Sequence, residues 1–262
     1  QLLKKNVLSI KQVRAYAGCA NHVANLLFVW RPFLDALGAA CAQVGQAKKS
    51  NAPHGMIWTQ QVRVRVEWIW WLLQEENGPL HRHWNIEAYF DYYDALMMVL
   101  DASPFGLGGI LVWMGKPITY FSSPLTARDE RIHGYKIGAH RGQQAWGCLA
   151  VLVALRCWYG YWHGRRLSIK IKSDSMSALA LAERLKVGPS AKLIGEGLAL
   201  LYHHTQFEPT VEHIPGVANQ LSDLLSRLMD PSKHATLPDV LTALTVTSSP
   251  ARYDTHYEVL SA

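Results

Sequence analysis

A glycine-rich stretch between two apolar runs constrains this chain more than any other feature. In residues 99–112 (VLDASPFGLGGILV) the first apolar run ends at Asp101, the chain turns through Ser-Pro, and the second run starts among glycines. Short apolar runs bounded by turn residues predict strands. Glycine inside a strand marks a place where another backbone or a ligand comes close. The stretch therefore predicts a hairpin that carries a carboxylate, Asp101, where another group approaches the sheet.

Composition sets the broad class of the chain. With 262 residues, 49% hydrophobic and 18% charged, it is typical of a globular protein with one large domain or two modest ones. Its 26 Lys and Arg against 20 Asp and Glu, a net charge of +6, fit a polyanionic partner. Four cysteines without metal-ligand spacing favour reduced thiols, and so an intracellular location, nucleus or cytoplasm. No apolar run is long enough to predict a membrane span.

The periodicity of the apolar residues changes near residue 88. Before it the spacing is helical, and we expect helices at 10–17, 19–27 and 58–74. After it we expect a polar loop at 124–139 among strands at 95–102, 108–113, 117–122, 167–173 and 207–214 and helices at 143–158, 175–185, 190–204 and 219–229. The order βββαβααβα predicts an α/β fold with a mixed five-stranded sheet flanked by helices. We expect a helical segment at 1–86, an α/β domain at 87–230, and a poorly ordered tail at 231–262.

Two further acids lie in positions comparable to that of Asp101. Asp174 directly follows the strand expected at 167–173, and Asp223 lies in the first turn of the last expected helix. Carboxylates on rigid elements are the ligands that Mg²⁺ prefers. Two such ions about 3.5–4 Å apart can activate a water and stabilise a leaving oxygen. Each acid alone also has an ordinary explanation, as a turn former, a helix cap or a first-turn acid.

Three sequence motifs, which follow one another along the chain, favour a shared site over these separate structural roles. Residues 101–109 match D-A-S-x-x-G-x-G-G. Residues 173–179 match S-D-N-x-A-A-L with Ser175 in place of Asn and Ser177 in place of the first Ala, and residues 215–227 match P-G-x-x-N-x-x-A-D-x-L-S-R with Ser222 in place of Ala. In these motifs the chain resembles the ribonuclease H domain of a retroelement polyprotein, of the LTR or tyrosine-recombinase type. Residues 7–38 resemble, more weakly, the thumb-to-connection segment of the reverse transcriptase in such a polyprotein.

The resemblance implies a reaction, a cofactor and partners. The reaction is endonucleolytic hydrolysis of RNA in RNA–DNA hybrids with two divalent ions, Mg²⁺ or Mn²⁺. Asp101, Asp174 and Asp223 are the implied catalytic residues and metal ligands. The implied partners are the hybrid duplex and the reverse transcriptase portion of the same polyprotein, and no membrane. The chain has no Tyr-x-Asp-Asp sequence, so no polymerase activity is assigned to it.

One position departs from the family pattern. The family carries a Glu on the first long helix, just before an A-x-x-x-A-L run. Here the run is residues 150–155, and position 147 is Gly, with no other acid on the helix. This leaves open an inactive ribonuclease H fold that binds nucleic acid or a protein partner. It also leaves open a recruited structural subunit, which a large exposed apolar patch would indicate.

Basic residues suggest where phosphates could be held. Near the strand that leads to Asp174 the candidates are Arg165, Arg166, Lys170 and Lys172. In the first third of the chain they are Lys4, Lys5, Lys11, Arg14, Lys48, Lys49, Arg63 and Arg65. Contacts of this kind are salt-dependent and blind to sequence. For each of these residues a solvated surface is the open alternative.

Overall fold

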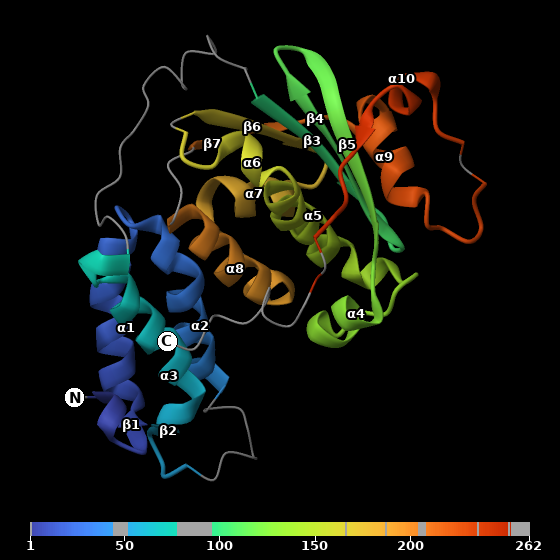
Figure 1. Ribbon diagram of the computed structural model, residues 1–262. Helices are drawn as coiled ribbons and strands as arrows, with labels where there is room; N and C mark the ends of the chain where they lie inside the picture. Colours follow the sequence, from blue (N-terminus) through green and yellow to red (C-terminus); the bar gives the residue numbers. More distant parts are fainter. Residues whose placement is uncertain are drawn as a thin grey trace. The chain divides into compact units, whose positions relative to one another are not determined.

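The structure, a computed structural model, describes residues 2–43, 52–77, 96–165, 167–186, 188–203, 208–234, 236–250 and 252 (Figure 1). The described chain forms two compact units, the first within residues 2–77 and the second within 96–252. In these ranges no helix is both long enough and apolar enough to cross a membrane.

The first unit consists of three helices and a short two-stranded sheet. β1 (Val7–Ser9) pairs antiparallel with β2 (Met56–Trp58), and the two strands lead directly into α1 (Ile10–Ala24) and α3 (Thr59–Leu72). α2 (Arg31–Gln43) contacts both of these helices. The short 3-10 helices are η1 (Leu2–Lys4), η2 (Phe28–Trp30) and η3 (Glu75–Asn77). Phe33 of α2 stacks on Trp68 of α3 with 5.8 Å between the ring centroids, so aromatic packing holds the helices together.

Gly18 was expected either to end the first helix or to mark a close helix crossing, and the structure shows neither. α1 is continuous from Ile10 to Ala24. A glycine inside a helix costs about 1 kcal/mol relative to alanine. Burial of Val13, Ala20 and Ala24 on one face of α1 offsets that cost, and the helix therefore runs through Gly18.

The second unit is built on a six-stranded mixed sheet. Its strands are β3 (Leu96–Ala102), β4 (Gly106–Trp113), β5 (Lys116–Pro124), β6 (Ser168–Ser173), β7 (Glu208–His213) and β8 (Thr245–Val246). The order across the sheet is β7-β6-β3-β4-β5-β8. β3, β4 and β5 form an antiparallel meander, β6 lies parallel to β3 and β7 parallel to β6, and β8 lies parallel to β5. β4 and β5 are joined by a turn at Met114 and Gly115, both with positive φ, as in a type I′ hairpin.

Helices cover both faces of this sheet. The elements are α4 (Ala127–His133), η5 (His140–Gly142), α5 (Gln143–Cys157), α6 (Tyr159–Trp162), α7 (Met176–Arg184), η6 (Pro189–Ala191), α8 (Lys192–His203), η7 (Gly216–Ala218), α9 (Gln220–Arg227) and α10 (Asp239–Thr242). α5, α7 and α8 lie on one side of the sheet, and α9 and α10 lie on the other (Figure 1). α5 is apolar all round and buried from Ala145 to Leu155, so it forms the centre of the core.

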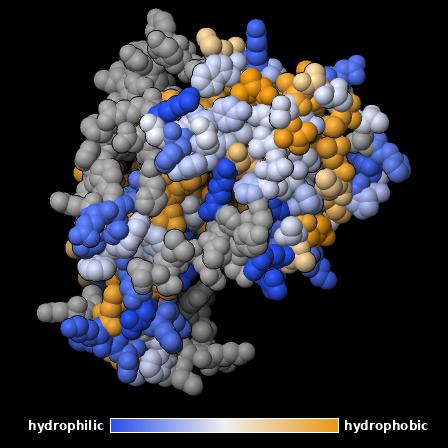
Figure 2. Space-filling model, viewed as in Figure 1, coloured by the Kyte–Doolittle hydropathy of each residue, from blue (hydrophilic) through white to orange (hydrophobic). Residues whose placement is uncertain are grey.

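The second face has its own smaller apolar cluster. Ile110, Val112, Tyr120, Leu225 and Leu241 are buried together there, from β4, β5, α9 and α10. Figure 2 shows apolar residues gathered over α9, α10 and the neighbouring strands. The cluster binds the C-terminal α10 to the sheet, so this short helix is part of the second unit.

The fold class predicted from the sequence is confirmed. The elements of the second unit include the predicted series βββαβααβα, with α4, α6, α10 and β8 in addition, and they form an α/β mixed sheet flanked by helices. One prediction within it is wrong, because the expected polar loop at 124–139 contains α4. Thr126 and Asp129 form a reciprocal capping box at the start of α4, and Gly134 ends the helix in the left-handed region.

A sixth strand, which the sequence did not predict, comes from the segment after residue 230. β8 pairs with β5 through the register Thr119 opposite Thr245. The Thr119 hydroxyl donates to the Thr245 carbonyl at 2.7 Å, and the Thr247 amide donates to the Tyr120 carbonyl at 2.8 Å. Further on, the Arg252 guanidinium pairs with the buried Asp129 carboxylate at 2.9 Å. This segment is therefore fixed along β5 by polar contacts.

Candidate functional site

The three predicted acids lie at one end of the sheet. Asp101 is the penultimate residue of β3, Asp174 directly follows β6, and Asp223 lies in the first turn of α9. β3 and β6 run parallel with Val99 opposite Lys172, so Asp101 and Asp174, each two residues further on, reach the same edge. The carboxyl ends of parallel strands are where open α/β sheets bind ligands.

Glycines of β4 bring α9 onto the sheet. A Cβ on Gly108 would lie 2.5 Å from the Ser226 nitrogen and 2.6 Å from the Ser222 carbonyl oxygen. A Cβ on Gly106 would lie 2.8 Å from the Ser226 carbonyl oxygen. All three distances are shorter than real Cβ atoms tolerate, so only glycine permits this approach. The prediction that the glycines admit another backbone is confirmed, and that backbone belongs to the helix that carries Asp223.

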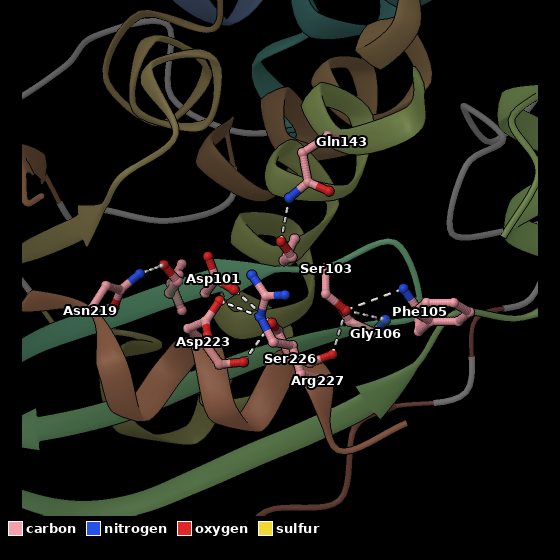
Figure 3. A network of polar contacts seen from close by, with 11 residues as sticks. Asp101, Ser103, Phe105, Gly106, Gln143, Asn219, Asp223, Ser226 and Arg227 are labelled. Carbon is pink, nitrogen blue, oxygen red and sulfur yellow. Dashed lines mark hydrogen bonds and ion pairs between the residues drawn. The ribbon is translucent and has the colours of Figure 1, made fainter. Parts of the chain in front are cut away.

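Hydrogen bonds then fix α9 in place. The Asn219 amide donates to the Leu100 carbonyl at 3.0 Å (Figure 3). The Ser222 hydroxyl donates to the Val99 carbonyl, also at 3.0 Å. In the other direction, the hydroxyls of Ser103 and Ser122 donate to the carbonyls of Ser226 and Leu225 at 2.6 and 2.8 Å. Side chains of α9, of its N-cap residue, of β5 and of the turn after β3 therefore determine where Asp223 lies relative to β3.

Asp101 is the most buried of the three acids, and burial changes its pKa. It is 7% exposed, and its Oδ2 accepts a hydrogen bond from the Ser226 hydroxyl at 2.6 Å. Burial raises the pKa of Asp101 to about 6, and the negative charges of Asp174 and Asp223 add to the rise. The Ser226 hydrogen bond opposes it by stabilising the carboxylate. Asp174 and Asp223 thus lie within electrostatic range of Asp101.

Asp223 has a cationic partner on its own helix. The Arg227 Nε donates to Asp223 Oδ1 at 2.5 Å, with the two residues four positions apart (Figure 3). Pairs at this spacing face each other on a helix. Both side chains are about two-fifths exposed, so solvent screens the pair. The sequence motif contains Arg227, but its spacing alone did not indicate a contact with the acid.

Asp174 is exposed at the start of the connection into α7. The loop before α9 passes beside it, since a Cβ on Gly216 would lie 3.4 Å from Asp174 Oδ2. The next residue, Ser175, caps α7 by accepting a hydrogen bond from the Ala178 amide at 3.3 Å. Asp174 therefore lies between two constrained backbone segments.

Gly147, where the family carries Glu, lies on the buried side of α5 next to α7. A Cβ placed on it would lie 2.8 Å from Ser175 Oγ and 3.2 Å from Ser175 Cβ. The structure therefore places position 147 directly beside the residue that follows Asp174.

Two residues that the sequence did not single out also support the site. The Gln143 side-chain amide donates to the Ala102 carbonyl, next to Asp101 (Figure 3). The Ser103 hydroxyl accepts from the amides of Phe105 and Gly106 at 3.2 and 3.1 Å, which orders the turn after β3. In the sequence only their positions could have indicated this role. Gln143 is the first residue of a predicted helix, and Ser103 lies in the motif of residues 101–109.

The side chains as placed do not fit a bound divalent ion. The donors are of the right kind, because carboxylate oxygens are what Mg²⁺ prefers. However, Asp223 Oδ1 is paired with Arg227 and Asp101 Oδ2 with Ser226, and position 147 offers no oxygen. Across the described ranges, no three His, Cys, Asp or Glu side chains are close enough together to hold one ion. We therefore derive no chemical step through a metal.

The basic candidates near Asp174 divide into three cases. Lys170 and Lys172 project from β6 and reach Glu212 of β7 at 3.9 and 3.0 Å. Arg165 is exposed before β6, and Arg166 lies outside the described residues. In the first unit Lys48 and Lys49 also lie outside the described residues. The nearest charge to both lysines of β6 is thus a carboxylate of the neighbouring strand.

Comparisons with known proteins give weak structural likenesses. No family model matches the chain, and no curated protein matches it. Among solved structures, ribonuclease H1 from the halophilic archaeon Halobacterium salinarum NRC-1 is 16% identical with a TM-score of 0.34, over 50% of this chain and 92% of that one. A foamy viral protease-reverse transcriptase in complex with double-stranded DNA is 15% identical with a TM-score of 0.31, over 94% of this chain and 38% of that one.

The second unit is an α/β domain with Asp101 and Asp174 at the carboxyl ends of its parallel strands and Asp223 on the helix that packs beside them.

Proposed function

We propose that the second unit is a ribonuclease H-type domain of a retroelement polyprotein, directed at the RNA strand of RNA–DNA hybrids. One observation carries the proposal. Three acids from segments far apart in the sequence meet at one edge of the sheet, closely enough for Asp174 and Asp223 to raise the pKa of Asp101. Crowding of like charges around a buried carboxylate is typical of functional sites.

We expect hydrolysis to be much slower than in a domain that has all four carboxylates of the family pattern. Hydrolysis of this kind depends on Mg²⁺ or Mn²⁺, which the side chains as placed do not fit. With Gly at position 147, the domain has three carboxylates where the family pattern has four. We expect the RNA strand to be distinguished by its 2′-hydroxyls across the wide minor groove of the duplex. The reverse transcriptase portion of the same polyprotein is the protein partner that this function implies.

A second candidate is a hybrid-binding or scaffold domain without hydrolysis. Two contacts favour it. Ser175 fills the space beside position 147, and Arg227 is paired with Asp223. In this case the fold and the duplex-binding surface are retained while the chemistry is lost.

Cleavage and binding measured together separate the two candidates. The full chain is incubated with a labelled RNA–DNA hybrid and Mg²⁺, alongside Asp101→Asn, and binding is measured by fluorescence anisotropy. Asp239→Asn removes an acid from α10, outside the site, and serves as the matched control. Slow cleavage that Asp101→Asn abolishes and Asp239→Asn keeps supports the nuclease. Binding without cleavage in all three proteins supports the second candidate, and neither binding nor cleavage contradicts both.

A further inference from the structure

The segment between α5 and β6 is rich in aromatic residues, and most of it is exposed. Residues 157–165 are CWYGYWHGR, and α6 lies within them. The side chains of Tyr159 and Tyr161 are 36% and 39% exposed, and His163 and Arg165 are exposed as well. These exposed rings have no role in the site that contains the three acids.

Two of the exposed rings are stacked on each other. Tyr159 and His163 lie four positions apart, with 4.3 Å between their ring centroids and 23° between their ring planes. The His163 amide donates to the Tyr159 carbonyl at 2.9 Å, so the backbone of this turn keeps the two rings together. A third planar ring could extend this stack at little cost in ordering the side chains.

A buried tryptophan fixes the stack to the core. Trp162 is 1% exposed, and its Nε1 donates to the Leu155 carbonyl at 3.2 Å. Tyr159 packs edge-on against Trp162, with 4.8 Å between the ring centroids. The exposed rings are therefore held on a rigid element, which is what a preorganised binding site needs.

The sequence around these rings is basic. Residues 131–173 contain no Asp or Glu and eight Lys or Arg. Arg165 follows the stacked rings, is exposed, and forms no ion pair with a described residue. A negatively charged partner is therefore favoured. Aromatic rings beside cations bind nucleic acids by stacking on unpaired bases.

The segment is remote from the acids. α5 begins at Gln143, whose side chain binds the carbonyl next to Asp101, and it ends at Cys157, shortly before α6 (Figure 1). At 1.5 Å per residue, its 15 residues span about 22 Å. A ligand on the rings therefore binds at a second place, separate from the edge of the sheet where the acids lie.

We propose that residues 159–165 bind single-stranded nucleic acid, with an unpaired base stacked on the Tyr159–His163 pair and Arg165 in contact with a phosphate. The bases of a duplex are covered by their neighbours, whereas those of a single strand can stack on protein side chains. This inference goes beyond the proposed function, because it uses none of the three acids and no divalent ion.

Binding of a fluorescein-labelled oligo(dT) of about 12 residues to the full chain tests the site, by fluorescence anisotropy in EDTA. We expect Tyr159→Ala and His163→Ala each to weaken binding about fivefold or more, because each removes a stacking ring. Tyr159→Phe and His163→Phe keep a ring and should bind within about twofold of the parent chain. Unchanged binding in both alanine variants would overturn the site and leave the exposed rings to a protein partner. Equal losses in the phenylalanine and alanine variants would overturn the stacking.

Salt dependence tests the phosphate contact. Arg165→Ala should reduce the slope of the logarithm of the binding constant against the logarithm of the salt concentration by about 0.7, as expected for one phosphate of a single strand. Lys116→Ala removes an exposed cation at the start of β5, outside the segment, and should leave the slope unchanged. If both variants reduced the slope equally, Arg165 would act through net charge alone, and its phosphate contact would be overturned.

The outcome can be separated from that of the proposed function. If oligo(dT) binds through the rings while the chain neither binds nor cuts a hybrid, the single-strand site stands and the hybrid-directed function fails. If the chain cuts the hybrid while all ring variants bind oligo(dT) as the parent chain does, the function stands and the single-strand site fails.

Discussion

The hydroxyl of Ser226 donates a 2.6 Å hydrogen bond to Asp101 Oδ2, across 125 positions of the sequence. The same serine lies where the backbone of α9 meets Gly108 of β4. One residue of α9 therefore both packs on β4, at Gly108, and stabilises the charged form of the most buried of the three site acids. The position of the helix and the ionisation of Asp101 are linked through it.

Removing this hydroxyl should destabilise the protein in a pH-dependent way. In Ser226→Ala the ionised Asp101 loses its donor, at a cost of about 1.5–3 kcal/mol where the carboxylate is charged. We expect the full loss at pH 8 and a smaller one at pH 5, where Asp101, with its pKa of about 6, is largely protonated. Urea unfolding at both pH values measures this. Ser222→Ala removes a hydrogen bond to a neutral carbonyl and should lower the free energy of unfolding equally at both pH values. If Ser226→Ala showed the same pH dependence as Ser222→Ala, the link between Ser226 and the ionisation of Asp101 would be contradicted.

Asp101 itself should make the protein less stable as the pH rises. The unfolded chain releases this proton near pH 3.8, whereas the folded protein holds it to about pH 6. Stability from this group is therefore lost between about pH 4 and pH 6 and stays lost above. Asp101→Asn should raise the free energy of unfolding by about 1–3 kcal/mol at pH 8 in EDTA, with little gain at pH 4. If the gain in the free energy of unfolding did not depend on pH, the ionisation of Asp101 would not be its cause.

A methyl group on the glycine strand should displace α9. Gly108→Ala places a carbon 2.5 Å from the Ser226 nitrogen, and we expect a loss of about 3 kcal/mol or more. Gly38→Ala in α2 has no atom within 4 Å of its Cβ and should instead stabilise its helix by about 0.5–1 kcal/mol. Amide hydrogen exchange over residues 220–227 provides the local measurement. Unchanged protection of α9 in Gly108→Ala would show that the helix does not depend on this contact.

The pair between Arg252 and Asp129 should be important for stability. Asp129 is fully buried, and Arg252 donates to both of its carboxylate oxygens at 3.0 Å. Arg252→Ala leaves that charge without its cation, which costs about 3–5 kcal/mol. Adding Asp129→Asn to Arg252→Ala removes the charge and should recover part of the loss in urea unfolding. If the double variant is the less stable of the two, the buried charge is not the cause.

Local patterns predicted much of the fold and the three acids, because these features repeat over short distances. The glycines near Asp101 predicted that another group approaches the sheet closely there, and the residues around Asp223 matched a long motif. The capping box of α4 was also present in the sequence as Thr126 and Asp129, and a search for that spacing would have found the helix.

The features that the sequence did not predict depend on contacts between distant segments. The contact of Gly147 with Ser175 exists only because α5 packs against α7. β8 has two residues and no periodicity of its own, and β5 determines its place. The pair of Arg252 with Asp129 joins residues 123 positions apart. No propensity or local spacing encodes such pairings.

The strand β8 has a consequence for where the second unit can be cut. A fragment that stops at Arg227, where the recognisable motif ends, lacks the strand that covers β5, and it exposes a row of unpaired amides and carbonyls on an apolar sheet. Open edges of this kind pair with other chains. Such a fragment would keep all three acids and still aggregate, whereas one that includes Arg252 would stay monodisperse.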